Sequence, residues 1–243
     1  MQSWGLTDPG CVRKQNQDAY RIEQLDRSTL LCVVCDGMGG ASGGQIASST
    51  VCDIVEDKIK KCYNKSMTER SLENLLLSSI TTANVSVFDR AVVDMDLKGM
   101  GTTIVCAVSM DDTVCIAHVG DSRAYYITED KITQITKDHS LVQQMLDNGQ
   151  ITKAEFENHP NKNIITRALG VGEDIEIDFD MVSLREDEAI LICSDGLSGL
   201  LSEEELFEIY KLVPFDRLTE VYIRAANERG GKDNITVVVM KNS

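Results

Sequence analysis

The sequence predicts an α+β fold in which antiparallel sheets are covered by pairs of helices. Two amphipathic helical patterns fill residues 43–91, a run of short strands with tight turns follows over 102–136, and helices and a final strand end the chain. Strands and helices do not alternate regularly, so a doubly wound parallel sheet is not expected. Since no repeat, linker or low-complexity segment interrupts the chain, we expect a single domain over residues 1–243.

Length and composition are typical of a globular protein. A chain of 243 residues can bury a core large enough to fold without disulfides. Residues 1–10 show no signal peptide, and the apolar runs are shorter than the ~20 residues that span a bilayer, so a soluble, cytoplasmic protein is expected. The net charge of −15 argues against nucleic acid or an anionic membrane as a partner.

The eight cysteines predict a reduced, intracellular protein. No C-x-x-C zinc pattern occurs, and no cysteine has an arginine six positions later, as a cysteine-nucleophile phosphatase requires. Five of them lie in apolar, strand-like runs, where cysteine acts as a small hydrophobic residue. These are Cys32, Cys35, Cys106, Cys115 and Cys193.

The first buried strand is predicted at residues 29–34, which are almost continuously apolar. It ends at Asp36, and the glycines of Gly37-Met38-Gly39-Gly40 allow the backbone to turn sharply beside whatever Asp36 binds. Taken alone, Asp-Gly is also a common turn pair. Residues 1–28 carry Arg13 and the polar cluster Gln15-Asn16-Gln17-Asp18 ahead of this strand.

The following elements are predicted from periodicity and capping signals. A helix covers residues 47–62, and a second, over 72–91, follows a Ser66–Glu69 capping box. Four successive strands then form an antiparallel meander. They are expected at residues 102–110, 114–119, 123–128 and 132–136.

Residues 138–174 are predicted to be a mobile insertion beside a functional site. A helix at 141–148 is ended by Gly149, and Thr152 with Glu155 forms another capping box. The chain then returns to regular elements. Strands are expected at 175–184, 188–194 and 235–240, with helices at 203–212, which Ser202 and Glu205 cap, and at 216–229.

Several aspartates occupy equivalent places in this pattern. Asp36 and Asp195 each end a buried strand and precede a glycine, and Asp233 comes just before the last strand. In antiparallel neighbours the start of one strand lies beside the end of the next, so these carboxylates are expected at one sheet edge. Asp18 and Asp121 are expected to reach the same edge. The alternative is that each aspartate is a solvated turn residue.

Clustered carboxylates require a compensating cation. Ligands that are all oxygen favour Mg²⁺ or Mn²⁺ over zinc, and three histidines are too few for a His-rich metallophosphoesterase. A pair of such ions suits in-line attack of a metal-activated hydroxide on phosphorus. The pattern therefore favours metal-assisted phosphoester hydrolysis.

The motifs resemble, in order and spacing, the signature of the PPM family, the metal-dependent protein serine/threonine phosphatases of type 2C, and most closely its compact bacterial branch. The resemblance extends from about Trp4 to Met240. It is carried by Arg13 with Asn16-Gln17-Asp18, Asp36-Gly37-Met38-Gly39-Gly40, Gly99-Met100-Gly101-Thr102-Thr103, Val119-Gly120-Asp121-Ser122-Arg123, Ser194-Asp195-Gly196 and Lys232-Asp233-Asn234-Ile235-Thr236.

The resemblance implies a four-layer α-β-β-α sandwich with two Mn²⁺ or Mg²⁺ ions at one end. Asp36 would bridge the two ions, the Gly37 carbonyl would bind one of them, and Asp195 and Asp233 would bind the other. Asp18 would hold metal-bound water. The implied reaction is hydrolysis of phosphoserine and phosphothreonine in proteins by a metal-bridging water or hydroxide, without a covalent intermediate.

Further roles follow from the same resemblance. Asp121 would contribute, with Asp195, to a third and weaker metal position. Arg13 would clamp the substrate phosphate, because a guanidinium matches phosphate geometry. Asn234 would orient Asp233 and its turn, and residues 138–174 would be a variable flap that influences substrate choice. The implied partners are phosphorylated proteins and a serine/threonine kinase that the enzyme opposes, and we expect a monomer.

One departure concerns the general acid. Bacterial relatives often carry a histidine directly after the glycine turn, where this chain has Ala41, so a water bound to the metals would donate the proton to the leaving group. Gln45, where relatives often carry Glu, is a smaller departure. Of the three histidines, His118 is expected to be packed within a strand, and His139 and His159 are expected to be solvated.

Other readings remain open at this point. Residues 178–182, Asp-Phe-Asp-Met-Val, match the pattern of phosphatases that form an aspartyl-phosphate, but that chemistry needs a buried parallel strand, and here the acidic residues should face solvent. A non-catalytic module with the same fold would be expected to lack one of Asp36, Asp195 or Asp233, and all three are present. A narrower reading limits the target to a phosphoserine on an anti-sigma antagonist.

Overall fold

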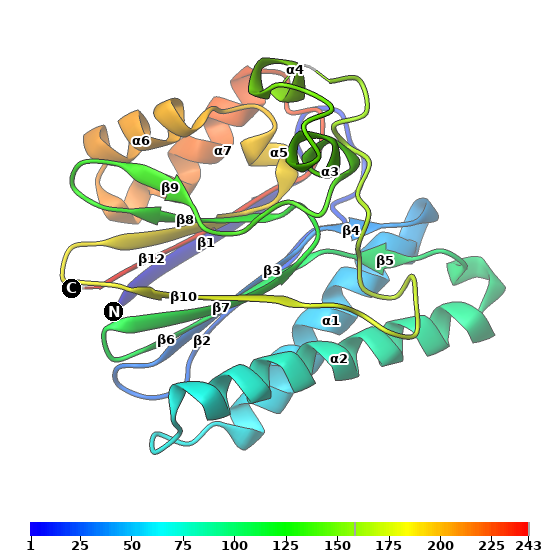
Figure 1. The fold of residues 1–243 in the computed structure, drawn as a ribbon, viewed down its shortest axis with the longest axis horizontal. Helices are drawn as coiled ribbons and strands as arrows, with labels where there is room; N and C mark the ends of the chain where they lie inside the picture. The colour runs from blue at the N-terminus through cyan, green and yellow to red at the C-terminus, as the bar shows by residue number, and fades with distance from the viewer. Residues whose placement is uncertain (158, 243) are drawn as a thin grey trace.

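The chain folds into four stacked layers, helices–sheet–sheet–helices, in a computed structural model that describes residues 1–157 and 159–242. Figure 1 shows two antiparallel sheets face to face, with α1 (Gly40–Cys62) and α2 (Glu69–Val93) covering one and α6 (Glu203–Leu212) and α7 (Leu218–Glu228) covering the other. The predicted α+β four-layer sandwich is confirmed.

Each large sheet has five strands. The sheet beside α1 and α2 has the order β10 (Asp178–Ser183), β7 (Thr113–Val119), β6 (Ile104–Met110), β3 (Leu30–Cys35), β2 (Ala19–Gln24). The sheet beside α6 and α7 has the order β1 (Gln2–Asp8), β12 (Ile235–Lys241), β11 (Ala189–Cys193), β8 (Arg123–Ile127), β9 (Ile132–Gln134). The short strands β4 (Gly37–Met38) and β5 (Gly101–Thr102) pair at one end of the sandwich, and both termini lie at the other end (Figure 1).

The remaining helices are short. They are α3 (Leu141–Asp147), α4 (Lys153–Glu157), α5 (Asp195–Ser198) and the 3-10 turns η1 (Met95–Leu97) and η2 (Phe215–Arg217).

The apolar core fills all three spaces between the layers. Strand β3 shows why its sequence is continuously apolar. Leu31 and Val33 pack against α1 and α2, whereas Cys32 and Val34 face the second sheet. Because side chains alternate across a strand, a strand between two covered faces needs apolar residues at every position.

Three sequence-based expectations for the strands are wrong in detail. The expected meander is divided, because β6–β7 belongs to one sheet and β8–β9 to the other. The chain crosses between the sheets at Gly120-Asp121-Ser122, where Gly120 has a φ of +108°. Strands β1 and β2 were not predicted, since both are edge strands with mixed burial. Strand β10 covers only residues 178–183 of the predicted 175–184.

The capping predictions have mixed outcomes. Ser66 does not cap α2, because Thr68 accepts the hydrogen bond from the N–H of Ser71 instead. The capping box of Ser202 and Glu205 on α6 is present as predicted.

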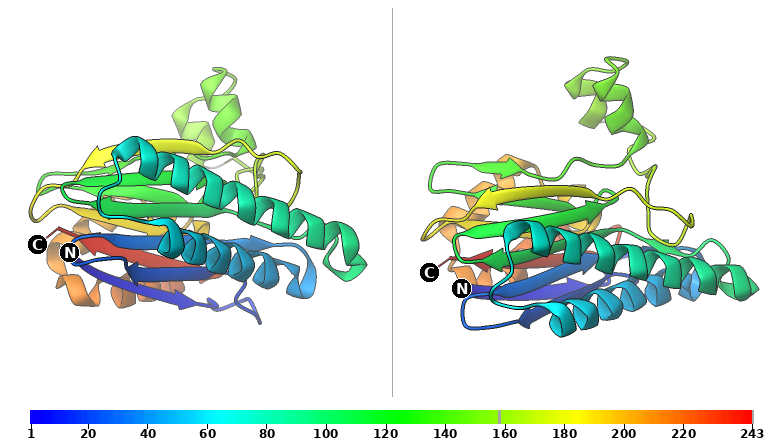
Figure 2. Two further views of the ribbon diagram at one scale, coloured as in Figure 1. Left: turned by 90° about the horizontal axis from the view of Figure 1, so that it is seen from below. Right: turned by 60° about the horizontal axis from the view of Figure 1, so that its bottom comes forward.

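The flap region projects from the sandwich. Figure 2 shows α3 and α4 standing clear of the layers. Thr152 and Glu155 form the reciprocal capping bonds predicted for α4. Within residues 138–174, residue 158 lies outside the described part of the chain, as does the side chain of Ala41 in α1. In the described ranges, no helix has the length and apolar character needed to cross a membrane.

The five cysteines that the sequence placed in strand-like runs are buried, as predicted, together with Cys52. Cys11 and Cys62 are exposed.

Candidate metal centre

The predicted acidic residues meet at the end of the sandwich that carries β4 and β5. Asp36 follows β3 in one sheet, whereas Asp195 follows β11 and Asp233 precedes β12 in the other. The expectation of one shared sheet edge is therefore wrong, because β3 pairs with β2 and β6 rather than with β11 or β12. The site lies between the ends of two sheets.

The backbone of Asp36 is held by the Gly101-Thr102-Thr103 segment. The carbonyl oxygen of Asp36 accepts hydrogen bonds from the N–H of Thr103 at 2.9 Å and from Thr102 Oγ1 at 2.8 Å. The N–H of Asp36 donates to Thr103 Oγ1 at 3.0 Å. After burial and the charge of Asp18, the charge of Asp195 from the opposite sheet helps to raise the pKa of Asp36, so the Asp36 and Asp195 side chains lie near each other. The Gly101-Thr102-Thr103 segment thus fixes the position of the Asp36 backbone.

Two glycines allow the acidic segments to approach their neighbours. A Cβ on Gly196 would lie 1.9 Å from the carbonyl oxygen of Asn234, so only glycine lets Asp195 pack beside the segment of Asp233. A Cβ on Gly37 would lie 2.1 Å from a backbone oxygen of α1. In both places the Asp-Gly pair is required by close backbone contact.

Asp18 is buried and partly bonded. Its Oδ2 accepts hydrogen bonds from Ser194 Oγ at 2.8 Å and from Thr236 Oγ1 at 2.7 Å. Thr236 Oγ1 in turn accepts from Thr7, since its own proton is given to Asp18, and Asn16 Nδ2 donates to Thr7. Asp18 Oδ1 is buried and has no partner among the described residues. The Oδ2 atom of Asp18 is therefore held by two hydroxyl groups, whereas its Oδ1 atom remains able to accept a further hydrogen bond.

The electrostatics of the site favour a bound cation. Burial, followed by the charges of Asp195 and Asp233, raises the pKa of Asp18 to about 7. Burial and the charge of Asp195 raise the pKa of Asp121 to about 8. The pKa values of Asp36 and Asp195 are raised by burial and by the neighbouring carboxylates. Ionising all of these groups together requires positive charge in the site.

Arg13 and Asp233 form an ion pair at the outer side of the site. Arg13 Nη2 donates to Asp233 Oδ2 at 2.8 Å, and both side chains are partly exposed. The N–H of Asn234 donates to Asp233 Oδ1. The Asn234 amide also holds the loop that carries Arg13 and Asp18, by accepting from the N–H of Gln17 and donating to two loop carbonyls.

A cavity of about 680 Å³ opens beside the acidic residues. The residues that line it include Asp121 and Asp195 from the acidic group, Val142 and Phe156 from the flap, and Leu201.

The residues present fit a hard divalent cation. The donors are all oxygen atoms, the buried Oδ1 atoms of Asp18 and Asp195 have no partner among the described residues, and the acidic groups have raised pKa values. Mg²⁺ and Mn²⁺ prefer such ligands. The hydroxyls of Ser194 and Thr236 were not given a role from the sequence, although both flank the aspartates in the predicted motifs.

The histidines and the Asp178 strand differ from expectation in three respects. His118 is packed as predicted, and its Nε2 bonds to the carbonyl oxygen of Lys137. His139 was expected to be solvated but is buried, because it bonds to Gly120; His159 is partly buried. Asp178 is partly buried rather than facing solvent, and it lies on an antiparallel edge strand, which does not support aspartyl-phosphate chemistry.

The comparison with known families is decisive at this point. The family model described as Protein phosphatase 2C matches residues 12–239. The chain belongs to the protein phosphatase 2C family. It is thus a metal-dependent enzyme that acts on phosphorylated proteins, and the predicted family, activity and dependence on Mn²⁺ or Mg²⁺ are confirmed.

Similar proteins cover almost all of this phosphatase. The serine/threonine phosphatase stp of Listeria innocua is 38% identical over 238 residues, 98% of this chain and 94% of that protein. The crystal structure of the serine/threonine phosphatase Stp1 from Staphylococcus aureus has a TM-score of 0.93 at 34% identity and covers 100% of this chain and 95% of that one. The catalytic domain of PstP, solved in complex with two manganese ions, has a TM-score of 0.84 at 30% identity and covers 98% of this chain and 96% of that one.

Proposed function

We propose that the phosphatase holds two Mn²⁺ or Mg²⁺ ions between the ends of its two sheets and hydrolyses phosphoserine and phosphothreonine without a covalent intermediate. The side chains of Asp36, Asp195 and Asp233 and the carbonyl oxygen of Gly37 would hold the ions, and Asp18 would hold a water. The observation that carries this proposal is the group of buried carboxylates with raised pKa values and unpartnered oxygens. The manganese-bound PstP domain supports the count of two.

Bound divalent cations acidify a water and neutralise the charge that develops on phosphorus. The protein supplies orientation. Ser194 and Thr236 saturate Oδ2 of Asp18, so its Oδ1 is left to accept a hydrogen bond from a water in the site. The nucleophile can then be aligned before the substrate binds.

Arg13 binds the substrate phosphate. Its Nη2 donates to Asp233 Oδ2, so the guanidinium stands at the exposed side of the site. From there it would make paired hydrogen bonds to a phosphate.

The proton for the leaving alkoxide comes from a water in the site. Position 41 is alanine, which has no group to donate. Asp121, with Asp195, holds a third and weaker ion. The charge of Asp195 is a main cause of the raised pKa of Asp121, which supports placing the two carboxylates around one cation.

The wider setting follows from the same site. Residues 1–243 form one phosphatase domain, with the flap at 138–174 contributing to substrate choice through the wall that it gives to the cavity. The enzyme acts as a cytoplasmic monomer. It removes the phosphate groups that a serine/threonine kinase adds to proteins. Eight free cysteines suit a reducing compartment.

The test is phosphate release from a phosphothreonine peptide with Mn²⁺ and then with excess chelator. Asp233→Asn is compared with Asp130→Asn, a matched change at an exposed turn. Turnover that needs the metal, is lost in Asp233→Asn and persists in Asp130→Asn is expected. Folded protein that is silent with every metal would indicate a binding module, and chelator-resistant turnover would contradict the metal mechanism.

A further inference from the structure

We propose that His139 is a positioning residue, which fixes the Gly120–Asp121 turn to the neck of the flap (the paired residues 139–141 and 164–166) and thereby sets the affinity of the cation held by Asp121. The inference rests on the proposed function, because it assumes that Asp121 binds a metal ion.

His139 clamps both backbone groups of Gly120. The N–H of His139 donates to the carbonyl oxygen of Gly120 at 2.9 Å, and the N–H of Gly120 donates to His139 Nδ1 at 3.0 Å. Gly120 has a φ of +108° and packs so tightly on Thr103 that a Cβ would lie 2.5 Å from the threonine methyl. The residue directly before Asp121 thus has little freedom as long as His139 is in place.

The same histidine belongs to the neck of the flap. Its carbonyl oxygen accepts from the N–H of Thr166 at 2.8 Å, and the N–H of Leu141 donates to Ile164 at 2.8 Å, so the two chains of the neck are paired. Farther along, Leu169 exchanges backbone hydrogen bonds with Thr102, whose side chain supports Asp36. The neck therefore connects the turn of Asp121 to the turn of Asp36.

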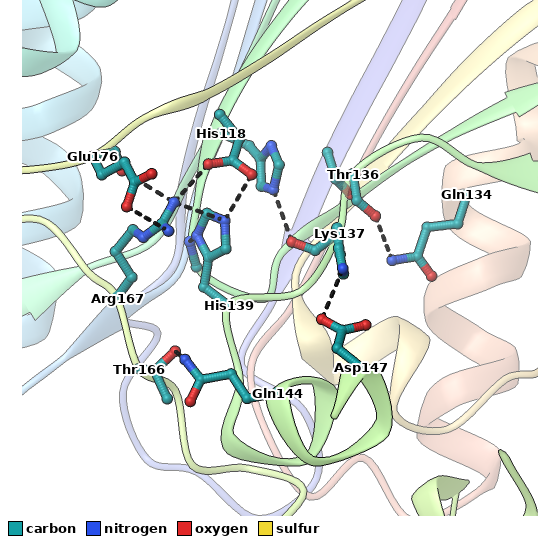
Figure 3. Close-up of polar contacts among 12 residues, drawn as sticks. His118, Gln134, Thr136, Lys137, His139, Gln144, Asp147, Thr166, Arg167 and Glu176 are labelled. Atoms are coloured by element: carbon teal, nitrogen blue, oxygen red, sulfur yellow. Dashed lines mark hydrogen bonds and ion pairs between the residues drawn. The ribbon is translucent and has the colours of Figure 1, made fainter. Parts of the chain in front are cut away.

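The outer edge of the His139 ring is also fixed. Since Nδ1 accepts a hydrogen bond, the ring proton lies on Nε2, which is 3.3 Å from Asp178 Oδ2. Arg167 Nη1 lies 3.0 Å from the same Nε2 and donates to the other oxygen of Asp178 at 2.6 Å. The ring stacks on His118 with centroids 4.8 Å apart. Figure 3 shows His118, His139 and Arg167 converging at this point. Burial, His118 and Arg167 lower the pKa of His139, which agrees with a neutral ring.

A metal ion is the competing explanation for this cluster, because one ligand atom from each of His118, His139 and Asp178 lies within 4.8 Å of the others. However, His139 Nε2 carries the ring proton and is not a free ligand. The guanidinium of Arg167 already supplies positive charge to Asp178. Only His118 Nδ1 is left without a partner among the described residues, which is too few donors for a metal site.

The experiment compares His139→Asn with His139→Gln in the full chain. Asparagine places its amide oxygen near the position of Nδ1 and can still accept from Gly120, whereas glutamine places its polar group near Nε2 and cannot. Arg167→Gln is the control, because it removes the guanidinium from both Asp178 and His139 Nε2 but keeps the two hydrogen bonds between His139 and Gly120. The metal-free proteins are titrated with Mn²⁺ while free Mn²⁺ is measured by electron paramagnetic resonance, and exchange of the Gly120 amide is followed by NMR.

In His139→Gln we expect the weakest Mn²⁺ to bind about tenfold less tightly, with the tighter ions unchanged and the Gly120 amide exchanging faster. His139→Asn and Arg167→Gln should behave like wild type in both measurements. A folded His139→Gln protein with wild-type Mn²⁺ binding and slow Gly120 exchange would overturn the proposal, as would equal losses in all three variants. If wild type itself binds no Mn²⁺, the proposed function fails, and the Gly120 exchange still reports on the clamp.

Discussion

Thr103 and Asp36, which belong to two different turns of the site, form a reciprocal pair of hydrogen bonds. Each residue donates its backbone N–H to the other, at 2.9 Å to the Asp36 carbonyl and at 3.0 Å to Thr103 Oγ1. Thr103 Oγ1 is also 2.7 Å from Ser122 Oγ, next to Asp121. One buried hydroxyl thus connects the segments that carry two of the proposed metal ligands.

Replacing Thr103 with valine should destabilise the protein. The change keeps the shape of the side chain but leaves the N–H of Asp36 without its partner, which costs about 1–3 kcal/mol of unfolding free energy. Urea denaturation of the metal-free protein measures this cost. The matched control is Thr133→Val at an exposed position of β9, where little change is expected. Equal stabilities for the two variants would contradict the role given to Thr103.

Gly196→Ala should separate Asp195 from Asp233. The new Cβ would lie 1.9 Å from the backbone oxygen of Asn234, so the segments must move apart, at a cost of about 1–3 kcal/mol. Both the melting temperature and the affinity for Mn²⁺ should fall. Gly172→Ala is the control, because its nearest contact is an ordinary 3.4 Å. If Gly196→Ala binds Mn²⁺ as wild type does, the close packing is not needed for the site.

The stability of the metal-free protein should fall as the pH rises from about 4 to about 8. Asp18 and Asp121 have pKa values raised from 3.8 to about 7 and about 8, so the folded chain binds their protons more tightly than the unfolded chain. This contribution is complete below the unfolded pKa and is lost as the pH passes the folded values. Thermal unfolding in excess chelator measures the effect.

Mn²⁺ should cancel this pH dependence, because cations bind the ionised carboxylates. The rise in melting temperature on adding Mn²⁺ is therefore expected to be larger at the higher pH. The Asp18→Asn protein, which lacks one of the titrating groups, should show a flatter profile in chelator. A metal-free wild type that becomes more stable across this range would show that the site is not a cluster of protonated acids.

Arg13→Ala should lower kcat/KM for a phosphothreonine peptide by roughly tenfold to hundredfold, since a hydrogen bond to a charged group is lost. Arg13→Lys should recover only part of the activity, because lysine cannot make the paired contact. Lys14→Ala, at the exposed neighbouring position, is the control and should be near wild type. Steady-state kinetics at saturating Mn²⁺ separates the three, and unchanged kcat/KM in Arg13→Ala would remove Arg13 from phosphate binding.

The sequence was most informative where the structure places a strict local demand on the residue type. The apolar run of β3 and the Asp-Gly pairs at 36 and 195 were recognisable because burial on both faces and close backbone contact each leave a direct trace in the residue types. Edge strand β1 was missed because its residues are only partly buried. With it, the role of Thr7 in the hydrogen-bond chain to Asp18 was missed as well.

Long-range pairing explains the other errors. His139 looked like a polar loop residue, and only its contact with Gly120, 19 positions earlier, makes it a buried residue. The change of sheet between β7 and β8 depends on how the two sheets stack, which no local periodicity encodes. The clustering of the acidic residues could be predicted, but not the fact that they come from both sheets.

Strand β12 is the neighbour of both β1 and β11, so the first strand of the chain pairs with the last. During synthesis on the ribosome, β1 has no partner until residues 235–241 have emerged, and Asp233 reaches its place at the same time. A chain that ends before residue 233 is therefore expected to lack phosphatase activity. A protease that removed β12 would switch the enzyme off and also expose two unpaired strand edges, which marks the fragment for aggregation or degradation.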